Sequence, residues 1–205
     1  MDQAHKTHLR KVAYFAGFFH TISVSIAAYV NSSFLEQFLP EKMLGLAYAL
    51  ASILTILCSF VIIRLIKKVG NRSTIITLGL LNALSILGLI IFDTSRLAVL
   101  FWISYEILIF LIVINLDLYV ESLSDDRTTG RIRGIYLTTV NLAWLLSPFL
   151  AGKLIADYDF SAVYTVALGS AVIFLYLVMR HLVETTKPED EKISIRKALG
   201  RVLAA

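Results

Sequence analysis

The segment RLIKKVGNRS (residues 64–73) places four cations and one glycine between two long, nearly uninterrupted apolar stretches. A helix needs about twenty residues to cross the roughly 30 Å hydrocarbon core of a bilayer, because it rises about 1.5 Å per residue. Each flank of the segment is long enough for this. The pattern predicts that residues 64–73 form a short charged connection between two transmembrane helices.

The composition of the whole chain agrees with this interpretation. Of its 205 residues, 58% are hydrophobic and 17% are charged, and the mean hydropathy is +0.77. A soluble domain usually carries about a quarter charged residues. The apolar residues also form long runs and lack the spacing of a half-buried surface helix. We therefore expect an all-α, polytopic membrane protein.

The apolar runs predict six transmembrane helices. We place them at residues 12–34, 42–66, 73–92, 97–122, 134–156 and 161–182. The first run is too long for a signal-peptide core and has no small-residue cleavage site behind it. We expect one six-helix bundle of three plus three helices over residues 1–184. Residues 185–205 would form a cytoplasmic linker or an amphipathic tail on the anionic membrane surface.

The distribution of positive charge predicts the orientation. Of the 19 Lys and Arg residues, all but Lys42, Arg96 and Lys153 belong to the N-terminal segment, the second-to-third and fourth-to-fifth connections, or the C-terminal region. By the positive-inside rule, both termini are cytoplasmic, in a plasma or inner membrane. The net charge of +4 thus reflects topology and does not indicate a nucleic-acid partner.

The charged connection resembles the loop motif GxLaDRxGRKxxL of major facilitator superfamily transporters. With Gly70 on the second glycine, four positions are compatible: Leu65, Lys68, Arg72 and Ile75. Three positions depart, because Ile63 replaces the first glycine, Lys67 the acid and Asn71 a cation. A tight turn with positive-inside charges would explain the same residues without the family.

The fifth predicted helix carries a second resemblance. Its sequence GIYLTTVNLAWLLSPFLAG (residues 134–152) is similar to the antiporter pattern GxxxxxxxxGxxxGPxxGG. The matching positions hold Gly134, Ala143, Ser147, Pro148, Ala151 and Gly152. Small residues let a neighbouring helix approach closely, and a proline frees a carbonyl and permits a bend. A small-residue packing face with a kink is the plainer alternative.

These resemblances imply the N-terminal six-helix half of a major facilitator superfamily transporter. In that family, loop cations and an acid at the cytoplasmic end of the fourth helix hold one face of the transporter shut. The corresponding latch here would comprise Lys68, Gly70, Arg72, Asp117 and Glu121. A full family member has two such halves. The chain would thus be a fragment, pair with a companion half, or form a homodimer.

Two ionisable residues lie deep in the predicted spans, where a charge costs several kcal/mol unless it is paired or hydrated. His20 lies about 14 Å in from Lys11, and Glu106 lies about 15 Å in from Arg96 on the other side. Both depths reach the midplane, where transporters bind substrate and coupling ions. We expect Glu106 and His20 to couple transport to protons. The alternative for each is a hydrogen bond that only orders helix packing.

The family resemblance also places helices one, four and five around the central cavity. It implies cavity or substrate-binding roles for Asn141, Tyr105 and Trp144. The alternative for Asn141 is a role in helix packing, which is also the interpretation of Asn31, Asn82 and Asn115.

The predicted function is secondary active transport of a small molecule, proton-coupled and with efflux as an option. The expected partners are the lipid bilayer, a small-molecule substrate and a second six-helix half. The sequence lacks metal-binding, phosphate-loop and hydrolase motifs, so no enzyme, cofactor or metal site is predicted. Two rivals remain: a non-transporting membrane scaffold or partner subunit, and an intramembrane enzyme using Glu106 and His20.

Overall fold

The computed structural model describes residues 3–124 and 128–185. Within these ranges the chain forms helices and no strand. In chain order they are α1 (Gln3–Ala28), α2 (Asn31–Leu35), α3 (Glu41–Val69), α4 (Asn71–Ile91), α5 (Leu97–Ser122), α6 (Thr129–Asp157) and α7 (Phe160–His181). All but the short α2 are long and apolar enough to cross a membrane, so the predicted all-α polytopic fold with six spans is confirmed.

The first span differs from the prediction at both ends. The helix already includes Gln3, because no residue before the apolar run breaks it and Leu9 is buried against the bundle. It ends at Ala28, and the predicted continuation to residue 34 is wrong because a turn and α2 follow. In α2 the ring of Phe34 packs 5.0 Å from that of Tyr164, which anchors this segment against α7.

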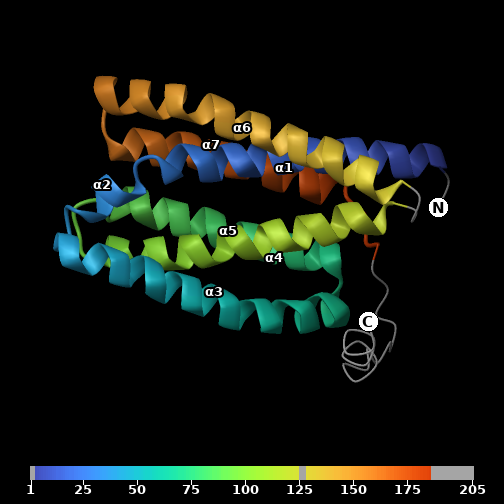
Figure 1. Ribbon diagram of the computed structural model, residues 1–205, viewed down its shortest axis with the longest axis horizontal. Coiled ribbons are helices and arrows are strands. Elements are labelled where there is room, and N and C mark those ends of the chain that lie inside the picture. Colours follow the sequence, from blue (N-terminus) through green and yellow to red (C-terminus); the bar gives the residue numbers. More distant parts are fainter. Residues whose placement is uncertain (1–2, 125–127, 186–205) are drawn as a thin grey trace, which may run out of the picture.

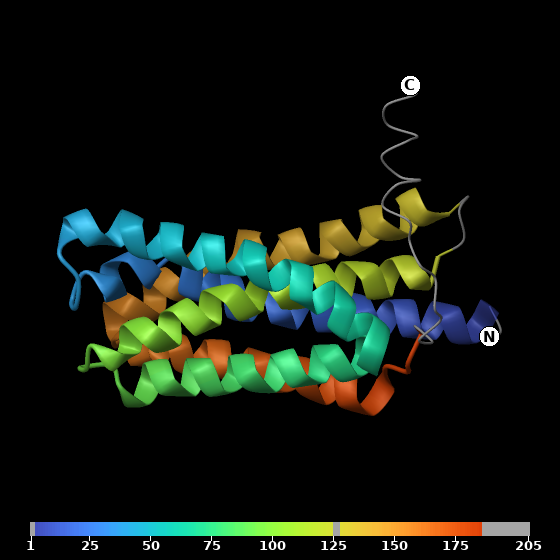
Figure 2. The same cartoon turned by 90° about the horizontal axis from the view of Figure 1, so that it is seen from below.

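The six long helices form one bundle of two groups. The first group packs α1 against α6 and α7, and the second packs α5 between α3 and α4. The groups meet chiefly where α4 lies along α7, with a smaller contact between α1 and α5. Figures 1 and 2 show the helices running roughly alongside each other with their connections at the two ends.

Two clusters of buried side chains fill the bundle. One extends from Leu9, near the N-terminal end of α1, to Phe174 in the middle of the bundle, and the other contains Trp102 and Tyr164. The outward faces of α3 and α6 remain strongly apolar and exposed, as expected for surfaces in contact with lipid or another hydrophobic partner.

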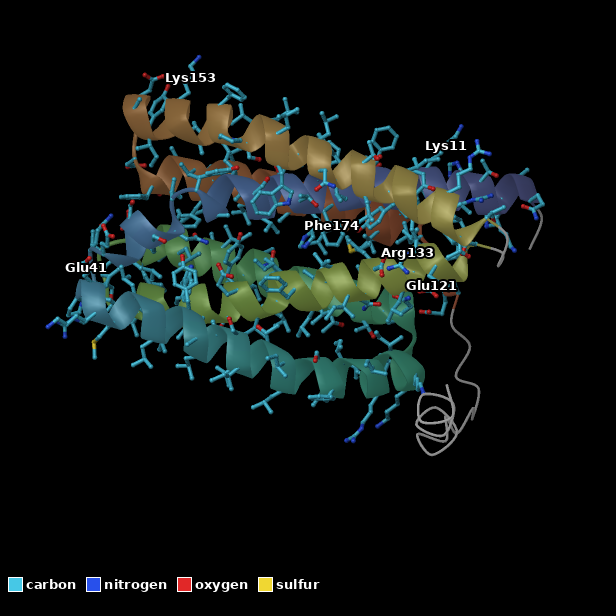
Figure 3. All side chains as sticks on the ribbon, viewed as in Figure 1. Lys11, Glu41, Glu121, Arg133, Lys153 and Phe174 are labelled. Carbon is cyan, nitrogen blue, oxygen red and sulfur yellow. The ribbon has the colours of Figure 1, made fainter. Side chains whose placement is uncertain are left out.

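Charged side chains mark the two ends of the bundle. Lys11, Glu121 and Arg133 lie at the end where the N-terminal part of α1 begins, and Glu41 and Lys153 lie at the other (Figure 3). The junctions α3–α4 and α5–α6 share the first end (Figure 1). The arrangement fits the predicted charge layout, while the side of the membrane that each end faces stays a prediction. The predicted tail from residue 186 onward lies outside the described residues.

Candidate functional site

Glu106 lies in the middle of α5 and belongs to a chain of hydrogen bonds across three helices. Its Oε1 accepts a hydrogen bond of 3.0 Å from Asn31 Nδ2 at the start of α2. Asn31 Oδ1 in turn accepts from the hydroxyl of Tyr164 on α7 at 2.9 Å. The break between α1 and α2 places Asn31 at this position. Among the described residues, none donates a hydrogen bond to Glu106 Oε2.

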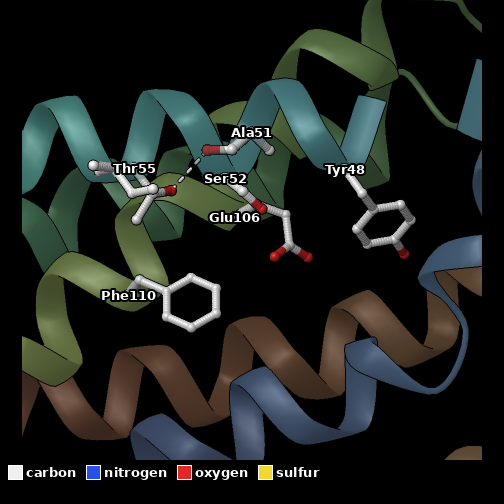
Figure 4. A pocket seen from close by; sticks show the side chains of 7 residues that line it. Tyr48, Ala51, Ser52, Thr55, Glu106 and Phe110 are labelled. Carbon is white, nitrogen blue, oxygen red and sulfur yellow. Dashed lines mark hydrogen bonds between the residues drawn. The ribbon is translucent and has the colours of Figure 1, made fainter. Parts of the chain in front are cut away.

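A wall of aromatic side chains surrounds the same carboxyl group. Tyr48 of α3 packs edge-on against Trp102 at 4.6 Å, and its hydroxyl lies 3.2 Å from Ser32 Oγ. Figure 4 shows the Glu106 carboxyl group between the rings of Tyr48 and Phe110, pointing away from the α3 backbone. The acid is therefore held in an otherwise largely apolar setting.

Two cavities meet at Glu106. The larger, of about 390 Å³, lies among α1, α3, α5 and α6 and is lined by Asn31, Tyr48, Phe110 and Trp144 besides the acid. The smaller, of about 230 Å³, lies between α3 and α5 (Figure 4). Of the described residues that line the two cavities, Glu106 is the only charged one. A small molecule that entered here would meet one carboxylate and several aromatic faces.

His20, the other mid-membrane titratable residue, lies apart from these cavities. It is buried, and its Nε2 donates to the Ile109 carbonyl oxygen at 3.4 Å, one helical turn beyond Glu106 along α5. The ring packs 5.2 Å from Phe174. This contact joins α1 to α5 and fits the packing alternative, and the coupling role of His20 stays a prediction.

The three predicted cavity residues occupy different places. Trp144 lines the larger cavity, with Tyr29 edge-on to it at 6.4 Å. Tyr105 is fully buried, and its hydroxyl donates to the carbonyl oxygens of Ser23 and Val24, so it ties α5 to α1. Asn141 is exposed and does not line either cavity at Glu106.

The small residues of the fifth-helix pattern fall into two sets. Ala143, Ser147 and Ala151 recur every fourth residue, are buried and form one face of α6. Ser147 Oγ pairs with Ser25 Oγ, so this face packs on α1. By contrast, a Cβ at Gly134 or Gly152 would meet no described atom within 4 Å. Pro148 lies inside α6 on the exposed side.

Most of the predicted charged connection (residues 64–73) is helical, because α3 ends at Val69 and α4 begins at Asn71. Gly70 alone forms the turn between them, and its φ of +94° favours glycine. The carboxylate of Glu184, which follows α7, accepts from the backbone N–H groups of Asn71 and Arg72 at 2.6 and 3.3 Å. A Cβ on Gly70 would collide with this carboxylate. Glu184 thus caps the N-terminus of α4, and the side chain of Arg72 donates to the Met179 carbonyl oxygen at 2.7 Å.

In this structure the acids predicted for the latch do not pair with Arg72 or Lys68. Asp117 forms an ion pair of 2.6 Å with Arg133 of α6. In the part of the chain that the structure describes, the side chains of Glu121 and Lys68 are exposed and have no hydrogen bond or ion pair. This conformation therefore links α5 to α6 through Asp117, and the charged connection to the end of α7 through Glu184. The latch itself stays a prediction.

The family model of the Major Facilitator Superfamily matches residues 13–204 of the chain. The match covers all six long helices except the first residues of α1. The chain belongs to the Major Facilitator Superfamily. None of the curated proteins that we compared matches it. As a superfamily member with six long helices, it corresponds to the N-terminal half of a transporter of this class, a multi-pass integral membrane protein.

Sequence reasoning missed most of the residues that surround Glu106. Asn31, interpreted as a packing residue, contacts Glu106, and neither Tyr164 nor Tyr48 was singled out. For Asn31, the signal available in the sequence was an amide side chain within an apolar segment. Glu184 carried no signal, because its role depends on a contact with residues more than a hundred positions earlier.

Proposed function

We propose that the chain is a proton-coupled secondary active transporter, or its N-terminal half, in which Glu106 carries the proton. Membership of the superfamily supports transport of a small molecule across the membrane. One observation carries the finer proposal: Glu106 is the only charged described residue that lines the two central cavities.

The surroundings of Glu106 suit a group that changes its protonation state. A permanent charge at mid-membrane depth is costly unless it is paired or hydrated. The amide of Asn31 stabilises the carboxylate when it is ionised, and the adjoining cavities offer a route for water. A proton can therefore bind or leave as the cavity opens to either side.

The same lining favours particular substrates. An acid within apolar and aromatic walls favours a molecule that is uncharged or cationic, because an anion would meet a like charge without a compensating cation. A cationic substrate would compete with the proton for one carboxylate. Such competition is a simple basis for antiport, which the fifth-helix pattern also favours.

A second six-helix half completes the proposed transporter. The larger cavity lies beside the exposed apolar faces of α3 and α6, where another bundle could close it. The second half would come from a longer chain, a companion chain or a second copy. Sizing the detergent-solubilised protein identifies which assembly to assay.

The test is flux in proteoliposomes with tetraphenylphosphonium, an apolar aromatic cation, as the probe. When a pH gradient is imposed, wild-type protein should move this cation against the cation's own concentration gradient. Glu106→Gln keeps the shape of the side chain but removes its titration, so gradient-driven flux should be lost. Glu41→Gln, an exposed acid at the start of α3, provides the matched control and should behave as wild type. Equal gradient-driven flux in wild-type and Glu106→Gln protein would remove Glu106 from the mechanism.

A further inference from the structure

A separate cavity of about 430 Å³ lies between α1 and the start of α6, at the N-terminal end of the bundle. It is within the size range of about 300–1,000 Å³ that is common for small-molecule sites. None of its lining residues lines the cavities at Glu106. We refer to it as the α1–α6 groove.

Each helix contributes one continuous stripe to the groove. The α1 stripe consists of Thr7, Arg10, Lys11 and Tyr14, which are spaced i, i+3, i+4 and i+7 and so share one helix face. Arg10 is oriented by its neighbours: its Nη2 donates to Thr7 Oγ1 at 3.0 Å and its Nε to the Lys6 carbonyl oxygen at 3.3 Å. Its guanidinium group is therefore held along the groove.

The α6 stripe has the same spacing and consists of Thr128, Arg131, Ile132 and Ile135. The Tyr14 hydroxyl donates to the Ile132 carbonyl oxygen at 3.2 Å and bridges the two helices. From the end of the bundle inward, the lining changes from hydroxyl groups through cations to apolar side chains.

The groove concentrates positive charge, and no acid is among the described residues that line it. Arg10, Lys11 and Arg131 line it, and among the described residues no carboxylate pairs with any of the three. Arg133, the next cation of α6, is by contrast paired with Asp117. The N-terminus of α6 adds the positive end of a 29-residue helix beside the same space. The chemistry suits a phosphate oxygen, which Arg and Lys bind through charge-assisted hydrogen bonds.

The inner half of the groove indicates which phosphate compound would bind. Ile135, which lines this half together with Ile132, is 45% exposed. These two apolar side chains end the groove toward the middle of α6, where an acyl chain would lie. A free phosphate ion would use only the polar half. We infer that the α1–α6 groove binds the phosphate headgroup of an anionic phospholipid, with the acyl chain over Ile132 and Ile135.

Native mass spectrometry of the full chain released from detergent tests this inference. The probes are dioleoyl phosphatidylglycerol, dioleoyl phosphatidylcholine and inorganic phosphate. We expect one phosphatidylglycerol to bind preferentially. Lys11→Gln/Arg131→Gln should weaken that binding by about tenfold or more, because each substitution removes one charge-assisted hydrogen bond from an exposed cation. Both side chains are exposed, so the fold should tolerate the change.

The matched control is Arg64→Gln/Lys67→Gln, which removes two exposed cations from α3 at the same end of the bundle but outside the groove. It should retain wild-type lipid binding. Equal losses in the two double variants would show diffuse surface attraction and overturn the site. Competition by inorganic phosphate at the same concentration as phosphatidylglycerol would overturn the assignment to a lipid. Neither outcome depends on transport by Glu106.

Discussion

The amide of Asn31 is oriented by two partners of different chemistry. An ionised carboxylate can only accept hydrogen bonds, so Nδ2 must face Glu106 and Oδ1 is left to accept from Tyr164. The hydroxyl of Tyr164 thereby holds Asn31 in the orientation that supports Glu106. One titratable side chain is thus supported by two neutral ones on other helices, which is why a search for ionisable residues alone found only part of the site.

At Gly70 the backbone conformation disfavours a larger residue, and a Cβ would also displace the carboxylate that caps α4. Its φ of +94° is disfavoured for residues with a Cβ, and a Cβ would collide with the Glu184 carboxylate. We expect Gly70→Ala to destabilise the fold by about 1–3 kcal/mol, measured as a lower thermal unfolding midpoint in detergent. Gly134→Ala is the control, since its Cβ has open space and alanine favours helix. A Gly70→Ala midpoint at or above the wild-type value would show that the turn adapts without cost.

At the scale of elements, sequence patterns predicted the helices better than their mutual contacts. Long apolar runs and charged connections were sufficient for six spans, because bilayer thickness determines helix length. The end of α1 was mispredicted, since the apolar run continues through the break before Asn31. The contacts of Glu106 and Glu184 join residues 75 and 113 positions apart, and no local pattern encodes them.

The cap that joins the end of α7 to the start of α4 makes an element-scale prediction. Glu184→Gln removes a negative charge from the N-terminus of α4, which should weaken that terminus by about 1 kcal/mol. Hydrogen exchange at the first-turn amides of α4, Asn71 and Arg72, should become several-fold faster. Glu36→Gln is the control, because this exposed acid directly follows α2, at the end of the bundle opposite the start of α4.

Comparing Glu184→Gln with variants of the predicted latch residues separates the cap from the latch. If the latch acts through Asp117 and Glu121, then Asp117→Asn and Glu121→Gln should change the reagent accessibility of cysteines in the central cavity. Glu184→Gln would then change exchange at α4 with little effect on that accessibility. Unchanged accessibility in both latch variants and in Arg72→Gln would leave the charged connection as a topology signal only.

Across the whole molecule, the labelled charged side chains lie at the two ends of the bundle, and exposed apolar side chains lie on its outward faces. The α3–α4 and α5–α6 junctions, which are rich in cations, lie at the same end as the N-terminal part of α1 (Figure 1). This follows because an even number of spans precedes each junction. Exposed apolar side chains lie on all the long helices and are most numerous on α3 and α6. Once the membrane side of one connection is assigned, the sides of all the other connections follow.

The positive-inside rule supplies that assignment and predicts that residues 67–72 and 125–133 face the cytoplasm, while residues 93–96 and 156–160 face outside. Of single cysteines introduced into these four segments in a Cys58→Ser background, only those at residues 93–96 and 156–160 should react with a membrane-impermeant reagent in intact cells. Permeabilised cells provide the control, because the inner positions should then react as well. Labelling of residues 67–72 in intact cells would reverse the orientation. It would also place the α1–α6 groove in the outer leaflet, since both lie at the same end of the bundle.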